Sequence, residues 1–142
     1  FIAYTNGEGE AVSELTVRDA VRTDNNTRNT KNLSDALLMT TSPRIFDAPD
    51  GARYDAMETR VKLARYGCDC YAYGMVAAGQ VDLVMESGLK VYDIAALIPI
   101  IENAGGVVTS WDGEDCSQGG TILAAANETL HAEALKVLAT HG

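Results

Sequence analysis

Two stretches of the sequence place polar or acidic side chains where a β-strand pattern gives way to a helical one. The first is RYGCDC at residues 65–70, and the second is Asp93, which opens an almost wholly apolar helical pattern. A glycine at a strand-to-helix turn lets the backbone approach a ligand, and the amides that follow can receive an anion. A carboxylate is one of the hard oxygen ligands that metal ions can use when a protein binds a phosphate. Both stretches are therefore candidate binding positions.

Each stretch also has a purely structural explanation. The first could be a plain turn in which Asp69 caps the helix that follows. Aspartate is a preferred N-cap residue and suits the positive end of a helix, so Asp93 could serve only as a cap. The residue types alone leave both explanations open.

Apolar strand patterns alternate with helical patterns over residues 33–142. We expect strands at 35–42, 63–67, 81–86, 107–111 and 121–126, and helices at 53–62, 68–79, 93–106 and 128–140. Residues 44–52 and 112–120 are interpreted as loops, and Pro99 should distort its helix because it lacks an amide hydrogen. Strands that are apolar throughout are covered on both faces. The pattern predicts an α/β fold in which a sheet lies between helical layers and binds ligands where strands end.

The first 32 residues differ from the rest. FIAYTNGEGEAV contains the turn signal Asn6-Gly7 and predicts a hairpin, whereas residues 21–32 are polar and predict an exposed connector. We therefore divide the chain into a hairpin and polar connector at 1–32 and an α/β domain at 33–142. Because the first residue is Phe1 rather than Met, we expect the chain to be a piece of a longer protein.

Composition narrows the classes of function. The chain has 142 residues and a net charge of -9, which opposes binding to nucleic acid or to anionic membranes. It contains neither a signal-like segment nor an apolar run of about 20 residues, the length that spans a membrane. Cys68, Cys70 and Cys116 cannot all pair within one chain, and their spacing is not that of a zinc site. We interpret them as reduced thiols of a cytoplasmic protein.

The stretch that begins with Asp93 also carries a family resemblance. YDIAALIPIIENAGG at 92–106 resembles the C-terminal signature W-D-x-A-A-x-x-x-(I/V)-(I/V)-x-E-A-G-G of the inositol monophosphatase superfamily, with Tyr92 in place of Trp and Asn103 one position after Glu102. TTSP at 40–43, RYGCDCYAYGMVAAGQVDLVMESGLKVYDIAALIPI at 65–100 and VVTSWDG at 107–113 resemble its histidinol-phosphatase branch. The resemblance covers about residues 33–142.

The resemblance implies a fold and a chemistry. The fold would be the C-terminal half of a layered α/β/α/β/α sandwich, and the activity would be Mg²⁺-dependent hydrolysis of small phosphate monoesters by a homodimer. By resemblance, Asp93 binds metal, and Glu86 contacts the alcohol part of the substrate. Arg65 and the turn formed by Gly67, Cys68 and Asp69 form the wall that faces the substrate. No residue is assigned as a catalytic nucleophile, acid or base.

The N-terminal metal motif of the family is missing from this sequence. The family has a glutamate followed by D-P-(I/L)-D-G-T; DAPDG at 47–51 differs in its proline position and lies in the wrong part of the order. One carboxylate cannot hold a catalytic metal cluster, so we expect this chain to lack strong activity without an N-terminal half. The resemblance to the histidinol-phosphatase branch makes histidinol phosphate the predicted substrate, and acidic Glu86 and Asp69 near one mouth would favour its cationic amine. The alternatives are an inositol-1-phosphate phosphatase and a non-catalytic binding domain with the same fold.

Overall fold

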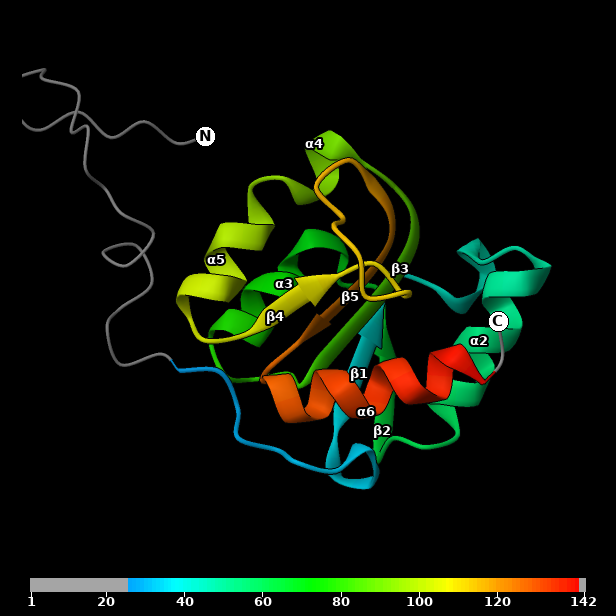
Figure 1. Cartoon of the computed structure of the whole chain (residues 1–142), viewed down its shortest axis with the longest axis horizontal. Coiled ribbons are helices and arrows are strands. Elements are labelled where there is room, and N and C mark those ends of the chain that lie inside the picture. Colours follow the sequence, from blue (N-terminus) through cyan, green and yellow to red (C-terminus); the bar gives the residue numbers. More distant parts are fainter. Residues whose placement is uncertain (1–25, 141–142) are drawn as a thin grey trace, which may run out of the picture.

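The sheet of this protein contains five strands in a mixed arrangement. The computed structural model describes residues 26–140, so the hairpin expected within 1–12 lies outside the described part. In chain order the strands are β1 (Leu37–Thr40), β2 (Leu63–Tyr66), β3 (Leu83–Lys90), β4 (Val107–Thr109) and β5 (Gly119–Ala125). Their spatial order is β2-β1-β3-β5-β4, with β1 parallel to β2 and β3 and with β5 antiparallel to β3 and β4. Figure 1 shows β5 between β3 and β4.

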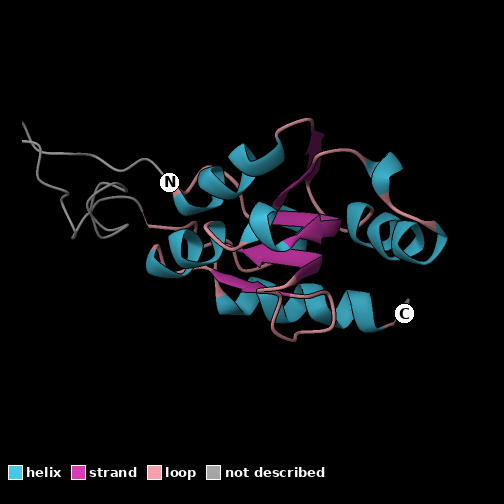
Figure 2. Ribbon diagram, turned by 90° about the horizontal axis from the view of Figure 1, so that it is seen from above, coloured by secondary structure: helices cyan, strands magenta, loops and turns pink. Residues whose placement is uncertain are grey.

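Helices cover both faces of the sheet. The α-helices are α2 (Ala48–Glu58), α3 (Asp69–Ala77), α4 (Val91–Ile94), α5 (Leu97–Asn103) and α6 (Glu128–Ala139), and short 3₁₀ helices span Leu33–Asp35 and Pro43–Ile45. α2 and α6 pack on one face, whereas α3, α4 and α5 pack on the other. Figure 2 shows the strands between these helical layers. The predicted α/β fold with a covered sheet is confirmed.

Two buried apolar clusters, one on each face, hold the layers together. Alternate residues of β3 point into them: Val84 packs with Tyr73 and Ile101, and Met85 packs with Trp111 on the opposite face. Because neighbouring side chains of a strand point to opposite faces, a strand covered on both sides must be apolar at every position. This explains why the central strands carry continuous apolar runs.

Helix α2 begins five residues earlier than the sequence suggested. We expected a loop at 44–52 and a helix from residue 53, but α2 starts at Ala48. The side chain of Asp47 accepts a hydrogen bond from the Asp50 amide at 3.2 Å and caps the first turn. Pro49 lies within that turn, where its missing amide removes no intrahelical hydrogen bond. The residues interpreted as a loop are therefore a helix start.

The prediction of a single helix at 93–106 is wrong. The chain forms α4 and α5 instead, and the break falls between Ile94 and Leu97. Pro99 is the third residue of α5, so its missing amide again falls in a first turn, where no helical acceptor is available. A continuous helix would have placed the proline ring against the carbonyl of Ala95. The break avoids this clash.

Strand β3 continues past its predicted end at residue 86 as far as Lys90. Its pairing with β5 shifts register between Glu86 and Leu89, which bends the strand. β5 begins at Gly119, where a Cβ atom would overlap the carbonyl oxygen of Leu89. The glycine therefore permits the close approach of β5 to the bent end of β3. No helix among residues 26–140 combines the length and the apolarity that crossing a membrane requires.

Candidate functional site

A pocket of about 350 Å³ lies where the β1 and β2 strands end. It is formed by the residue after β1, the first turn of α3, the bent half of β3, and α4. The residues that line it are Thr41, Asp69, Cys70, Tyr73, Glu86, Leu89, Tyr92 and Asp93. Ligand sites of α/β sheets lie outside the carboxyl ends of parallel strands, so the position suits a binding site. The pocket brings together three of the predicted site residues: Asp69, Glu86 and Asp93.

The turn from β2 into α3 is held in an unusual backbone conformation. Gly67 has a φ of +91° and donates its amide to the carbonyl oxygens of Thr40 and Thr41, at 3.2 and 2.9 Å. Asp69 has a φ of +42°, and among the described residues it is the one non-glycine with positive φ. The Thr41 hydroxyl donates to Asp69 Oδ1 at 3.0 Å and helps to fix this turn. Backbone strain of this kind is concentrated at functional sites.

Glu86 is a buried carboxylate with only one oxygen engaged. Glu86 is 2% exposed, and its Oε1 accepts a hydrogen bond from the Thr41 amide at 2.6 Å. Oε2 has no hydrogen-bond partner among residues 26–140. Burial raises the pKa of Glu86, although the Thr41 amide and the nearby hydroxyls of Thr41 and Thr40 oppose that shift. One acceptor atom is thus available to a ligand.

Tyr73 contributes a second buried polar atom to the same pocket. The residue is 2% exposed, and its hydroxyl has no hydrogen-bond partner in the described part of the chain. Burial raises the pKa of Tyr73 well above its usual value, and the nearby charge of Glu86 is the next cause. The phenol therefore stays protonated and can both donate and accept a hydrogen bond.

Asp93 lies on the exposed side of the pocket, two residues inside α4. Its Oδ2 accepts a hydrogen bond from the backbone amide of Lys90 at 2.8 Å. Lys90, and not Asp93, is the N-cap residue, which corrects the purely structural explanation offered from the sequence. Oδ1 makes no hydrogen bond to any described residue, so one oxygen can face a cation.

A complete metal site is not formed by the described residues. They contain no group of three or more histidine, cysteine, aspartate or glutamate side chains placed to hold a metal ion. Hard carboxylate oxygen is the right donor for Mg²⁺, so Asp93 fits as one ligand of a site that needs others. Its role as a metal ligand stays a prediction.

The remaining predicted residues are less directly placed. Arg65 lies in the edge strand β2, is exposed, and donates from Nη1 to the Ala64 carbonyl at 3.0 Å; it does not line the pocket. Gly67 and Cys68 form the turn that leads into the pocket wall, and Cys70 rather than Cys68 lines it. The substrate-binding roles of Arg65, Gly67 and Cys68 therefore stay predictions.

Five pocket residues were missed by sequence reasoning: Thr41, Cys70, Tyr73, Leu89 and Tyr92. Thr41 follows an apolar strand, and its position at the end of that strand was a usable signal. Tyr73 lies on a helix rich in small apolar residues, and its residue type does not distinguish a pocket position from a core position. Only the fold brings Tyr73 into the same pocket as Glu86.

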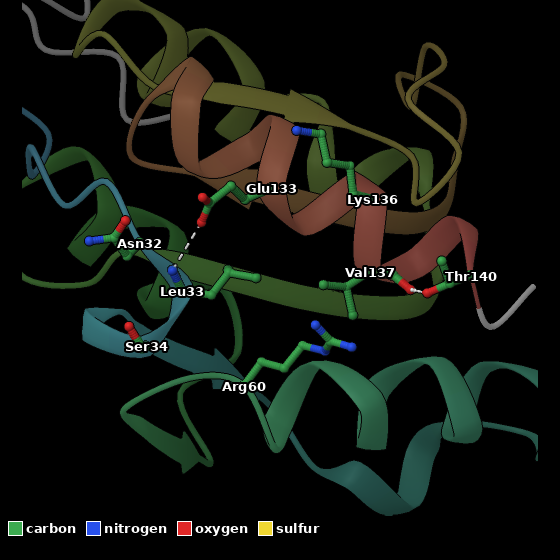
Figure 3. Close-up of a pocket in the computed structure, with 8 residues that line it drawn as sticks. All are labelled: Asn32, Leu33, Ser34, Arg60, Glu133, Lys136, Val137 and Thr140. Carbon is green, nitrogen blue, oxygen red and sulfur yellow. Dashed lines mark hydrogen bonds between the residues drawn. The ribbon is translucent and has the colours of Figure 1, made fainter.

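A second and larger hollow, of about 580 Å³, lies between the first 3₁₀ helix, the end of α2, and α6. It contains two exposed cationic side chains, Arg60 and Lys136. Figure 3 shows the Arg60 guanidinium beside Val137, whereas the Lys136 ammonium points away from it. Glu133 is already engaged, because it accepts a hydrogen bond from the Leu33 amide at 3.2 Å. These groups do not converge on one ligand, so we place the candidate site at the smaller pocket.

Comparison with known proteins defines the class of this chain. The sequence model of the inositol monophosphatase family matches residues 3–142, and the chain belongs to that family. The match begins well before residue 33, where the resemblance in the sequence began.

Individual relatives agree with this assignment. The chain is 43% identical over 127 residues to the chloroplastic bifunctional phosphatase IMPL2 of Arabidopsis thaliana, covering 83% of the chain and 37% of that protein. It is 40% identical over 78 residues to a histidinol-phosphatase of Mycobacterium tuberculosis, covering 55% of the chain and 29% of that protein. The chain thus spans well under half the length of these relatives.

The fold matches solved structures of the same family. An inositol monophosphatase from Zymomonas mobilis superimposes with a TM-score of 0.77 at 38% identity, covering 80% of this chain and 46% of that one. The five-stranded sheet with its helical layers is therefore the inositol monophosphatase α/β fold, and the chain corresponds to about its C-terminal portion.

Proposed function

We propose that this chain is the C-terminal half of a Mg²⁺-dependent phosphate monoester phosphatase whose substrate is histidinol phosphate. Membership in the inositol monophosphatase family supports the phosphatase class. The observation that carries the substrate choice is the pocket itself, which is lined by the carboxylates of Asp69, Glu86 and Asp93 and by no lysine or arginine. Such a pocket suits a substrate whose alcohol part carries a positive charge.

Different residues would bind the metal ion and the alcohol part of the substrate. Asp93 would supply one anionic oxygen to Mg²⁺, while its other oxygen stays bonded to the Lys90 amide. Mg²⁺, when bound, polarises phosphoryl oxygens and activates a water molecule. Glu86, fixed by the Thr41 amide, would bind the alcohol part, and the turn at 67–69 would form the adjacent wall. The other ligands of the metal would come from an N-terminal half.

The preference for a cation follows from the energy of charged hydrogen bonds. A hydrogen bond to a charged group contributes about 1.5–3 kcal/mol, and an ammonium donor adds a Coulomb attraction to the carboxylate that a neutral hydroxyl lacks. Relatives of the chain include proteins named histidinol-phosphatase and others named inositol-1-monophosphatase. Inositol 1-phosphate is therefore the alternative substrate, because its hydroxyls could also donate to Glu86.

The test compares two substrates in the full-length protein with Mg²⁺. We expect Glu86→Gln to lower kcat/KM for histidinol phosphate by about tenfold and to lower it less for inositol 1-phosphate. Glu102→Gln is the matched control, since Glu102 is exposed on α5 and does not line the pocket. Equal losses on both substrates would remove the argument for a cationic substrate.

A non-catalytic binding domain is the other alternative. It would be favoured if the full-length protein released no phosphate from either ester in the presence of Mg²⁺. We expect residues 1–142 alone to lack strong activity, because the described residues offer Asp93 but no complete metal site. The homodimer and the cytoplasmic location inferred from the sequence stay predictions.

A further inference from the structure

Two residues from different elements line the same pocket, and each carries a buried polar atom that has no hydrogen-bond partner among the described residues. The atoms are the hydroxyl of Tyr73 on α3 and Oε2 of Glu86 on β3, each on a residue that is 2% exposed. The large majority of buried side-chain polar atoms in native proteins are hydrogen-bonded, so an unpartnered pair in one pocket needs an explanation. A ligand group that satisfies both atoms is such an explanation.

We propose that Tyr73 is a further substrate-binding residue, and that its hydroxyl and Glu86 Oε2 together hold one hydroxyl or ammonium group of the substrate's alcohol part. The inference rests on the proposed function and adds a residue to it. It concerns the part of the substrate remote from the phosphate. It does not depend on whether that part is charged.

The two atoms offer complementary hydrogen bonds. A carboxylate oxygen only accepts, whereas a phenol can donate or accept. A substrate hydroxyl can therefore donate to Glu86 and accept from Tyr73, and a substrate ammonium can donate to both. Glu86 Oε1 is fixed by the Thr41 amide at 2.6 Å, which leaves Oε2 as the atom available for this contact.

The neighbouring tyrosine shows why the position matters. Tyr71 lies two residues earlier on α3, is 70% exposed and does not line the pocket. A helix turns by about 100° per residue, so residues two apart point to different sides. The same substitution at Tyr71 and Tyr73 therefore removes a hydroxyl from one helix in two different environments.

A purely structural role for Tyr73 predicts the opposite result to a binding role. Tyr73→Phe keeps the ring in the apolar cluster and removes a buried hydroxyl that has no described partner. If the hydroxyl did nothing else, the variant would be as stable as the wild type or more stable, with unchanged kinetics. If the hydroxyl binds substrate, stability should still hold while activity falls.

The experiment measures three phosphate esters with the full-length protein and Mg²⁺: L-histidinol phosphate, inositol 1-phosphate and phenyl phosphate. Phenyl phosphate carries no hydroxyl or amine on its alcohol part. We expect Tyr73→Phe to lower kcat/KM by about tenfold on the better of the two polar esters and by less than about twofold on phenyl phosphate. Its melting temperature should not fall, and Tyr71→Phe should match the wild type on all three esters.

The outcomes separate this inference from the proposed function. Equal losses on polar and apolar esters, or no loss on any ester, would overturn the role of Tyr73 while leaving a phosphatase. If the wild type hydrolysed none of the three esters, the proposed function would fail and the inference would fail with it. A selective loss on a polar ester with unchanged stability supports the assignment.

Discussion

A buried carboxylate accepts a backbone hydrogen bond at each end of strand β1. The two carboxylates differ in what lies near their second oxygen. At the amino end, Asp82 is fully buried and accepts a hydrogen bond from the Leu37 amide at 2.8 Å. At the carboxyl end, Glu86 accepts one from the Thr41 amide at 2.6 Å. The second oxygen of Asp82 lies 3.0 Å from Nε of Arg28 and forms an ion pair, whereas Glu86 has no ion pair with the described residues. Neither second oxygen accepts a hydrogen bond from a described residue.

This difference supports a structural role for Asp82 and the proposed binding role for Glu86. Arg28 is itself fixed, because its carbonyl accepts a hydrogen bond from the Asn127 side chain at 3.1 Å. The charge of Asp82 is thereby compensated within the fold. Glu86 is buried to a similar degree with less compensation, which is unfavourable unless a ligand supplies the missing partner. Burial alone therefore does not indicate function. A buried oxygen that lacks a partner and belongs to a residue lining a pocket favours a binding role.

The largest effect should follow from removing the structural carboxylate. Asp82→Ala leaves the Leu37 amide without its acceptor and Arg28 without its partner, so we expect a loss of about 3 kcal/mol in the free energy of unfolding. Because the Arg28 side chain is 40% exposed, solvent screens part of the ion pair, and Arg28→Ala should lose less. Urea unfolding of the full-length protein measures both. A loss below about 1 kcal/mol for Asp82→Ala would contradict the structural assignment.

We expect a substitution at Asp93 to change the free energy of unfolding less, but to lower the turnover of the enzyme strongly. Asparagine can still accept a hydrogen bond from the Lys90 amide, so Asp93→Asn should leave the melting temperature without metal nearly unchanged. It is a weaker ligand for Mg²⁺, so turnover should fall by about 100-fold and the Mg²⁺ requirement should rise. A Mg²⁺ titration of the phosphatase rate in the full-length protein measures this.

The matched control for that variant is Asp55→Asn, which makes the same charge change on the exposed surface of α2. The side chain of Asp55 makes no hydrogen bond or ion pair to the described residues, so neither rate nor stability should change. Wild-type turnover at the wild-type Mg²⁺ requirement in Asp93→Asn would reduce Asp93 to a residue that stabilises the start of α4.

The smallest effect concerns the pH dependence of stability at Glu86. Burial raises the folded-state pKa of Glu86, so the fold favours the protonated form more than the unfolded chain does. The stability that this form contributes at low pH is lost as the pH rises through the folded-state pKa. Glu86→Gln cannot ionise and should therefore be more stable than the wild type at pH 7, by about 1 kcal/mol. The difference should shrink toward pH 4. Melting curves without metal from pH 4 to 7 test this, and a constant difference across that range would contradict it.

Much of the fold was predictable because local patterns decide it. Continuous apolar strands predicted a sheet covered on both faces, and that is what forms around β3. The strand order was not predictable, since nothing local places β5 antiparallel between β3 and β4. The extent of α2 was misjudged because Asp47 and Pro49 fit a loop as well as a helix start. Pro99 indicated a distortion, but the pattern did not show that two separate helices would result.

The site was predictable only in part. The resemblance singled out Asp69, Glu86 and Asp93, and the fold brings them to one pocket although 24 residues separate the first from the last. Thr41 and Tyr73 enter the pocket through packing between elements distant in sequence, which a local pattern does not encode. Arg65 was expected at the pocket wall, but its strand is at the edge of the sheet and its side chain lies outside the pocket.

The position of β5 also has a consequence for how the chain is made. A ribosome releases β4 before β5, yet within the described sheet β5 is the strand that pairs with β4. Residues 107–109 therefore emerge without a partner and must wait until residues 119–125 have been synthesised. α5 can meanwhile pack against α3, which has already emerged. A nascent chain stalled before residue 119 should consequently protect its β3 amides from hydrogen exchange less than the released protein does, because most of the β3 pairing, that with β5, arrives last.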